Sequence, residues 1–531
     1  MKSFKIYLPM ILALAVVTGI MIGKRMNYPS RPVAMMDEDM REQKLRQLIN
    51  YIDYDYVDEV NTDSLLDLTI TDLLHKLDPH SSYISKNDVQ KSEESLKGSF
   101  DGIGIEYMIY HDTLVVLRLV PNGPSDKAGL KGGDRIVTIE GNPVAGIEFP
   151  EAEYPGLLKG QSGTKVKVGY YRPQDGSSAD LSITRGKIPL NSLDVAYMLT
   201  PDVGLIRLNR FAETTTDEFE EALSELQKKG MKTLILDLRD NPGGLLKGAI
   251  DIADAFLKKD ELIVYTKERS GNTNYTYATR KGDFEDGKLI VLINEGSASA
   301  SEIVAGALQD NDRATLIGRR SFGKGLVQEE MVLKDGSRVR LTTARYYTPT
   351  GRSIQKPYED GFEAYQREAE ERFKNGELEK PDSTAFENDE KFVTPGGKIV
   401  YGGGGIMPDI FVPIDTSGKA LGWLYHYFGY GQIDRFAFAY VDKHRKELSL
   451  LKMDTYQSTF SVTDSLLGEL ITFAGIKMQV ADLEPETRKI METRVKAMIA
   501  RNLWGDKGMF PVLFQDDPVI KMALAAAAQA S

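Results

Sequence analysis

Short apolar runs alternate with amphipathic segments through the middle of the chain. Continuous apolar runs of strand length are separated by segments in which apolar residues recur every three or four positions. Strands that are apolar throughout are typical of a sheet buried on both faces, so this rhythm predicts βα units around a largely parallel sheet. We expect strands at 203–211, 232–240, 262–266, 289–293 and 314–318, and helices at 214–230, 243–257 and 301–310.

The pattern changes on both sides of this α/β segment. Apolar residues recur at helical spacing near both ends of the chain, and glycines punctuate short strand-like runs just before the segment. A charged, proline-containing stretch after the last strand indicates an insertion or a mobile excursion that is partly helical. The expected regions are 27–97 (helical, after a linker), 98–188 (β-rich), 189–355 (α/β core), 356–397 (insertion), 398–415 (return to the core) and 416–531 (helical).

The first 26 residues have the pattern of an export leader. Lys2 and Lys5 precede an apolar run from Ile6 to Gly23, and two basic residues follow it. Such a leader is a signal peptide or a signal anchor, and its length is close to the minimum for crossing a bilayer. The A-x-A sequence at 13–15 lies inside the apolar run, which favours the uncleaved anchor. We therefore expect the chain on the periplasmic side of a bacterial cell envelope, held at the inner membrane.

Composition narrows the possible chemistry. The 531 residues carry a net charge of −12, which argues against general nucleic-acid binding. The absence of cysteine excludes disulfides, thiolate metal sites and a cysteine nucleophile. Five histidines are present, none between residues 112 and 425, and they are too scattered to predict a metal site. No metal or other cofactor is expected.

The junction NEGSASASEIVAG at 294–306 places three serines between a predicted strand and a predicted helix. Ser299 fits two interpretations, because Glu302 three residues later completes a capping box and because a serine at such a junction can be a nucleophile. A serine nucleophile needs a base, and a lysine serves if burial lowers its pKa. Lys324 lies between two glycines and next to apolar residues, so it is the candidate. The alternative for it is an exposed lysine in a glycine-rich turn.

The β-rich region resembles a PDZ domain. The resemblance is carried by GIGI, followed by KAGLKGGDRIVTIEG at 127–141. It implies that the GIGI loop offers backbone N–H groups to a peptide C-terminal carboxylate while the peptide adds a strand to the sheet edge. The alternative is a generic β-barrel with glycine turns. The implied peptide-binding residues are Gly102, Ile103, Gly104 and Ile105.

Five motifs in a fixed order resemble the C-terminal processing peptidases, also called tail-specific proteases, of serine peptidase family S41. They are DPHSSYIS at 78–85, the PDZ stretch, LILDLRDNPGG at 234–244, NEGSASASE and SFGKGLVQ. The resemblance implies a crotonase-like α/β peptidase core with an inserted or preceding β-rich PDZ domain and with N-terminal and C-terminal helical regions. It also implies an endopeptidase that cleaves proteins after its PDZ domain has recognised their C-terminal tails.

The same resemblance assigns roles to single residues. Ser299 is the implied nucleophile, Lys324 the general base and Gln328 the residue that orients the lysine. Asp310 is expected to support the site, and the alternative for it is a solvated carboxylate at a helix end. The implied oxyanion hole uses the amide of Gly243 or Gly244 together with that of Ala300.

Two other functions are kept as alternatives. One is a non-catalytic PDZ adaptor with a degenerate peptidase core, and the other is a crotonase-type enzyme acting on acyl thioesters. The helical segments at 38–97 and 416–531 are candidate surfaces for a homodimer or an adaptor protein, or they are structural additions.

Overall fold

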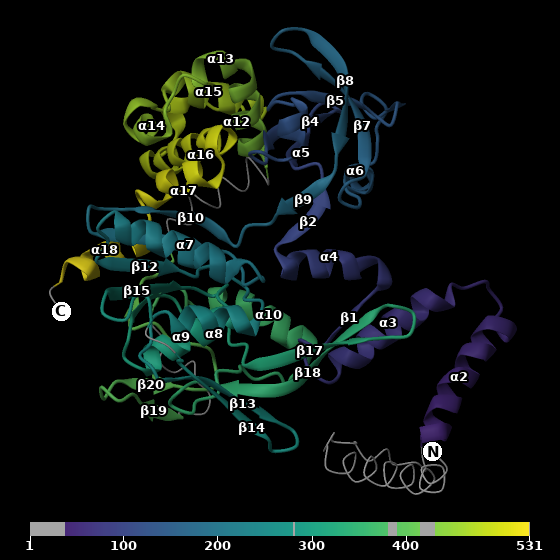
Figure 1. Ribbon diagram of the computed structural model, residues 1–531, viewed down its shortest axis with the longest axis vertical. Coiled ribbons are helices and arrows are strands. Elements are labelled where there is room, and N and C mark those ends of the chain that lie inside the picture. Colours follow the sequence, from purple (N-terminus) through teal and green to yellow (C-terminus); the bar gives the residue numbers. More distant parts are fainter. Residues whose placement is uncertain (1–37, 280–281, 381–389, 415–430, 530–531) are drawn as a thin grey trace, which may run out of the picture. The chain divides into compact units, whose positions relative to one another are not determined.

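The computed structural model describes residues 38–279, 282–380, 390–414 and 431–529 (Figure 1). The chain falls into two units, Met1–Asp72 and Leu73–Ser531. No helix in the described ranges is both long enough and apolar enough to cross a membrane. The predicted leader at 1–26 lies outside the described residues.

The described part of the first unit is helical. It holds α2 (Glu38–Asp55) and the larger part of α3 (Thr62–His75). Asn61 fixes the start of α3, because its Oδ1 accepts a hydrogen bond from the amide of Ser64 at 3.0 Å. Several apolar side chains of α2 are exposed, among them Leu45, Leu48, Tyr51 and Tyr54.

A PDZ-like module follows α4 (Lys86–Lys97). The chain enters the module through β2 (Ser99–Gly102) and leaves it through β9 (Gly186–Pro189), and these two strands pair with each other. The main sheet has the strand order β3-β4-β5-β7-β8, with β6 beside β5. The strands of this sheet are β3 (Ile105–Ile109), β4 (Leu114–Leu119), β5 (Arg135–Ile139), β6 (Asn142–Pro143), β7 (Lys165–Arg172) and β8 (Ser177–Thr184). The module also holds the short helices α5 (Pro124–Ala128) and α6 (Tyr154–Leu158).

The α/β core is built on a six-stranded sheet. Its strand order is β10-β11-β12-β15-β16-β21, and all neighbours are parallel except the pair of β10 and β11. The strands are β10 (Leu193–Met198), β11 (Val203–Leu208), β12 (Thr233–Asp237), β15 (Lys288–Ile293), β16 (Thr315–Gly318) and β21 (Ile410–Phe411). The predicted arrangement is therefore confirmed: an α/β core with a β-rich PDZ-like module and with N-terminal and C-terminal helical regions.

Successive residues of each core strand point to opposite faces of the sheet, and helices cover both faces. On β12, Leu234 and Leu236 pack into the cluster formed by α7 (Thr215–Lys228), α8 (Leu246–Asp254) and α9 (Ala300–Asp310). Ile235, between them, packs on the other face with side chains of α17 (Asp506–Phe514) and α18 (Pro518–Ala528). The last helices of the chain thus complete the core (Figure 1).

A second sheet, in which all the strand pairs are antiparallel, lies beside this core. Its order is β1-β18-β13-β14, and β17 pairs with β18. The loop of residues 319–325, here called the lysine loop, joins β16 of the first sheet to β17 of the second. The strands are β1 (Ser82–Ile84), β13 (Leu262–Glu268), β14 (Thr273–Tyr277), β17 (Leu326–Val332) and β18 (Arg338–Tyr347).

The C-terminal region is helical from Gln432 onward and has its own apolar core. That core joins α12 (Gln432–Lys443), α13 (Arg445–Leu448), α14 (Met453–Thr459), α15 (Asp464–Phe473) and α16 (Pro485–Trp504). An ion pair between Arg135 of β5 and Asp442 of α12, at 2.6 Å, links these helices to the PDZ-like module.

Candidate active site

The three serines of the junction have different surroundings. Ser297 and Ser301 are fully buried, and their hydroxyls donate to the backbone carbonyls of Leu238 and Asn241 at 2.8 and 2.9 Å. Ser299 is half-buried and has a φ of +55°, which is a strained conformation for a residue with a side chain. Strain of this kind is concentrated at functional sites, so the geometry favours Ser299 among the three.

Ser299 is also the N-cap of α9, as the capping-box spacing predicted. The Glu302 carboxylate accepts a hydrogen bond from the Ser299 amide at 2.9 Å. The two interpretations of Ser299 are therefore compatible. The hydrogen bond to Glu302 uses the backbone amide of Ser299, so it fixes the position of the backbone that carries the hydroxyl. A serine at this point also lies beside the first amides of a helix, which have no partner within the helix.

Glu302 ties the serine junction to the lysine loop. One carboxylate oxygen accepts from the amides of both Ser299 and Lys324, at 2.9 and 2.8 Å. The other oxygen accepts from the Ser321 hydroxyl at 2.6 Å and the Gly323 amide at 2.7 Å. Burial raises the pKa of Glu302, and these four hydrogen bonds oppose the rise because they all favour the carboxylate.

A second bridge joins the same two segments. The Tyr346 hydroxyl is 3.2 Å from the Ser299 carbonyl and 2.7 Å from the Lys324 carbonyl. Two amides that share one acceptor oxygen lie within about 6 Å of each other. Glu302 and Tyr346 therefore bring the backbones of Ser299 and Lys324 together from two directions.

The Lys324 side chain is half-buried. Burial and the nearby positive charge of Arg340 together lower the pKa of its ammonium group to about 8, while Glu302 and Asp78 oppose the shift. A lysine in this range is substantially neutral near pH 8, which a general base requires. Because Lys324 is half-buried, the alternative of an exposed lysine in a glycine-rich turn is wrong.

Gln328 lies near the start of β17, four residues after Lys324. The Lys324 Nζ atom donates to its Oε1 atom at 3.0 Å. With the amide oriented in this way the lysine gives one N–H to Gln328, and the nitrogen lone pair is left to accept a proton. The structure thus brings together the side chains of Lys324 and Gln328, the pair that the family resemblance implied.

The glycine pair after β12 forms a loop rather than a helix start. We predicted a helix from residue 243, but α8 begins at Leu246 because Gly243 and Gly244 have φ values of +95° and +145°. A methyl group added to Gly243 would lie 2.8 Å from the amide nitrogen of Ala300, so this glycine lets the two loops approach each other. The Gly243 amide donates to the Asn241 side chain at 2.9 Å, which leaves Gly244 as the oxyanion candidate of the pair.

Asp310 lies at the far end of α9, about 16 Å along the helix from Ser299. It is fully buried and pairs with Arg352 at 2.6 Å, and it accepts from the hydroxyl and the amide of Thr350 at 2.6 and 3.1 Å. The alternative of a solvated carboxylate is therefore wrong. Asp310 holds the turn that follows β18, the strand that carries Tyr346.

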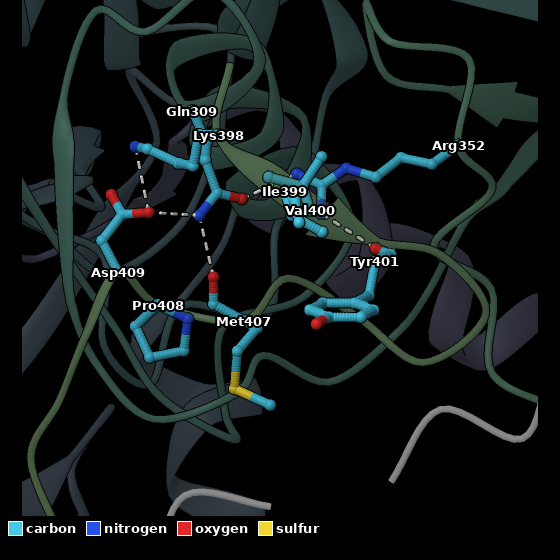
Figure 2. A pocket seen from close by; sticks show the side chains of 9 residues that line it. All are labelled: Gln309, Arg352, Lys398, Ile399, Val400, Tyr401, Met407, Pro408 and Asp409. Carbon is cyan, nitrogen blue, oxygen red and sulfur yellow. Dashed lines mark hydrogen bonds and ion pairs between the residues drawn. The ribbon is translucent and has the colours of Figure 1, made fainter. Parts of the chain in front are cut away.

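Figure 2 shows the pocket that Arg352, the arginine of this ion pair, lines together with Gln309 and Tyr401. The Arg352 guanidinium donates to Gln309 Oε1 at 2.7 Å and to the Tyr401 carbonyl at 2.9 Å, and Gln309 in turn donates to the Met407 carbonyl at 2.9 Å. The residues joined by these hydrogen bonds line a pocket of about 300 Å³. The pocket's polar groups bond to one another, so this part of the core supports structure rather than chemistry.

We expect Asp310→Ala to destabilise the protein by about 3–5 kcal/mol, because it leaves the buried Arg352 guanidinium without its counter-charge. Urea unfolding measures the effect. Asp310→Asn keeps an acceptor for Thr350, so the free energy of unfolding should fall less in this variant than in Asp310→Ala. Below the melting temperature, cleavage by the folded Asp310→Ala protein should persist. A loss under about 1 kcal/mol, typical of a surface carboxylate, would contradict the structural role.

The ring of His80, to which no sequence pattern assigns a role, lies beside the lysine loop. The ring packs edge-on to Phe322, with 6.3 Å between ring centroids, and its Nε2 atom lies 2.7 Å from the Tyr365 hydroxyl. Burial and the charge of Lys324 lower the pKa of His80 to about 3, so the ring is neutral. Only a fold that returns β1 to β18 brings His80 here, and no local pattern indicates that return.

The four GIGI residues lie where the chain passes from β2 into β3. Ile103 is buried, and the carbonyls of Ile103 and Gly104 accept from the amides of Ser125 and Val120, both at 3.0 Å. β3, which begins at Ile105, pairs only with β4 among the described strands. One edge of β3 is thus available for an added strand.

Comparisons with known proteins agree with this architecture. The family model described as peptidase family S41 matches residues 202–363, and a PDZ domain model matches 102–184. A family of unknown function, DUF8443, matches residues 423–505. The fold and these matches define a PDZ-containing peptidase of family S41.

Individual relatives are more specific. The chain is 42% identical over 305 residues to a carboxy-terminal-processing protease of Bartonella bacilliformis, covering 56% of this chain and 69% of that protein. It is 35% identical over 319 residues to the carboxy-terminal processing protease CtpA of Bacillus subtilis, covering 60% and 67%. The solved structure of a photosystem II D1 C-terminal processing protease matches with 27% identity and a TM-score of 0.36, covering 73% of this chain and 90% of that one. The chain belongs to the family of carboxy-terminal processing proteases.

Proposed function

We propose that this peptidase is a serine endopeptidase in which Ser299 is the nucleophile and Lys324 is the general base. The observation that carries the proposal is the shared acceptor, because one oxygen of Glu302 holds the amides of both residues. The lowered pKa of Lys324 supports it, since a serine hydroxyl needs a base that is neutral at the working pH.

Acylation begins when the Ser299 Oγ atom attacks the scissile carbonyl carbon and its proton passes to the Lys324 Nζ atom. The negative charge that develops on the carbonyl oxygen is held by backbone amides, for which Ala300 and Gly244 are the candidates. The protonated lysine then gives a proton to the leaving amine as the C–N bond breaks. The product is an acyl-enzyme on Ser299.

Deacylation repeats these steps with water as the nucleophile. Lys324 takes a proton from the water as it attacks the ester carbonyl, and Ser299 leaves with that proton. Gln328 keeps the lysine oriented through the bond to its Oε1 atom. Asp310 takes no part in proton transfer and supports the core that carries the site.

Substrate capture belongs to the PDZ module. A protein with an unstructured apolar C-terminal tail places its terminal carboxylate against the amides of the loop Gly102–Ile105, and the tail pairs with the open edge of β3. A preference for protein C-termini follows from this mode of binding, because an internal segment has no terminal main-chain carboxylate at the end of the added strand.

Localisation and assembly are part of the same proposal. The leader at 1–26 places the enzyme in a bacterial cell envelope, with its substrates on the periplasmic side and the leader as an inner-membrane anchor. Two regions are candidate surfaces for a homodimer or an adaptor protein. One is α2, several of whose apolar side chains are exposed, and the other is the group of C-terminal helices.

A serine-directed fluorophosphonate distinguishes the enzyme from a non-catalytic PDZ adaptor and from an acyl-thioester enzyme. We expect covalent labelling of the wild type with the adduct on Ser299, because only an activated serine reacts. Peptide mapping by mass spectrometry locates the adduct. An unlabelled protein, or an adduct on another serine, would contradict the assignment of Ser299. Hydrolysis of acyl thioesters without peptide cleavage would support a crotonase-type acyl-thioester enzyme instead of a peptidase.

A further inference from the structure

Part of the charged stretch at 356–397 packs against the lysine loop. We predicted an insertion or a mobile excursion at 356–397, yet within its described part α10 (Phe362–Lys374) has a buried face. Tyr365, Glu368 and Arg372 recur at helical spacing on that face, and Tyr365 and Arg372 are 5% and 3% exposed. Most of the remaining residues of the helix are exposed, so this face is where α10 packs most closely against the protein.

Arg372 holds the backbone at the start of the lysine loop. Its guanidinium donates to the carbonyls of Arg320 and Ser321, at 2.8 and 3.1 Å. It also pairs with Glu377, whose carboxylate pairs with the Arg320 side chain at 2.7 Å. All these groups are buried, so the loop carbonyls depend on Arg372 for their hydrogen bonds.

Lys356 and Tyr365 hold the middle of the loop. The Lys356 ammonium lies 4.1 Å from the centre of the Phe322 ring and 4.0 Å from that of Tyr365, and it pairs with Glu368 at 2.5 Å. The Lys356 amide donates to the Gly323 carbonyl at 2.9 Å. Lys324 is the next residue along the loop.

We propose that the five residues Lys356, Tyr365, Glu368, Arg372 and Glu377, here called the α10 clamp, position the lysine loop so that Lys324 stays beside Ser299 and out of water. The inference rests on the proposed function, because it takes Lys324 as the base. The clamp residues act through the loop and touch no reacting atom, so they are positioning residues.

Weakening the clamp has two separable consequences. A loop that moves by about 1 Å misplaces the base and lowers kcat, since losses of about 100-fold follow such displacements. Water that enters beside Lys324 also brings its pKa back toward the ordinary value of a lysine. The charged and polar groups that face Lys324 from its other neighbours are Glu302, Gln328, Arg340, Asp78 and His80, and the substitutions below leave all five in place.

The test compares Arg372→Gln and Tyr365→Leu with the matched control Arg367→Gln on the exposed side of α10. Tyr365→Leu keeps an apolar side chain on the buried face but removes the ring that contacts the Lys356 ammonium and the Phe322 ring. It remains informative if Arg372→Gln does not fold. Peptide-cleavage kinetics between pH 6 and 10 and fluorophosphonate labelling rates are measured on the full chain. The folded state of each variant is checked by thermal unfolding.

We expect kcat to fall about tenfold or more in Arg372→Gln and several-fold in Tyr365→Leu, with KM unchanged within about twofold because tail capture is elsewhere. The pH at half-maximal activity should rise in both variants and stay unchanged in Arg367→Gln. Wild-type kinetics and pH profiles in both folded clamp variants, or in folded Tyr365→Leu alone if Arg372→Gln does not fold, would overturn the clamp. A failure of the Ser299–Lys324 assignment is seen separately, as retained activity in Lys324→Ala.

Discussion

Ser299→Ala lowers the rate of cleavage of a protein with an unstructured apolar tail by about four orders of magnitude or more, on our account. Removing the nucleophile of a serine peptidase leaves only the stabilisation offered by the oxyanion amides and substrate binding. The change deletes one half-buried oxygen, and the Glu302 side of the capping box remains, so stability should change by about 1 kcal/mol at most. Tail binding, measured by fluorescence anisotropy, should be retained.

Ser301→Ala is the matched control for this substitution. Ser301 lies in the same motif, but its hydroxyl donates to the Asn241 carbonyl and has no proposed part in the reaction. We expect its cleavage rate to stay within about tenfold of the wild type once the folded fraction is allowed for. Equal cleavage by wild type and Ser299→Ala would end the assignment.

Lys324 gives the second large effect. Both Lys324→Ala and Lys324→Arg should lose about three orders of magnitude or more in kcat, because neither side chain can take the Ser299 proton. The arginine variant is the sharper test. Arginine keeps the positive charge, but the pKa of its guanidinium is so high that no neutral form is available to accept a proton. Single-turnover cleavage measures the chemical step directly.

Lys374→Ala serves as the matched control, because Lys374 lies on α10, pairs only with Glu370 in the described structure and is 68% exposed. Activity in Lys324→Arg would indicate that the cation, rather than proton transfer, is what the site uses. Activity in Lys324→Ala would show that another group is the base.

The sheet and its covering helices could largely be predicted from the sequence. Alternate residues of β12 and β15 reach two different apolar clusters, and strands of that kind have continuous apolar sequences. The helix that follows β12 was predicted three residues too early. A pair of glycines is compatible with a helix N-terminus on composition alone, and only the close approach of Ala300 fixes them as a loop.

Contacts distant in sequence explain what was missed. Glu302 had a recognisable capping-box spacing, but nothing local indicates that its carboxylate also receives the lysine loop. The charged composition around α10 is typical of a solvated surface, and only the buried Arg372 and Tyr365 reveal the packed face. The segment 416–531 was expected to be a partner surface or a structural addition, yet α18 within it covers one face of the core sheet.

The pH dependence of Ser299 acylation tests the central claim most directly. Fluorophosphonate labelling of the wild type is followed from pH 6 to 10 by intact-protein mass spectrometry. The pKa of Lys324 lies at about 8, so the neutral, active form of the base is lost as pH falls through that value. The account predicts that the labelling rate falls about tenfold per pH unit below about pH 7 and reaches a plateau above about pH 9. A rate that is constant across this range would contradict a lysine base beside Ser299.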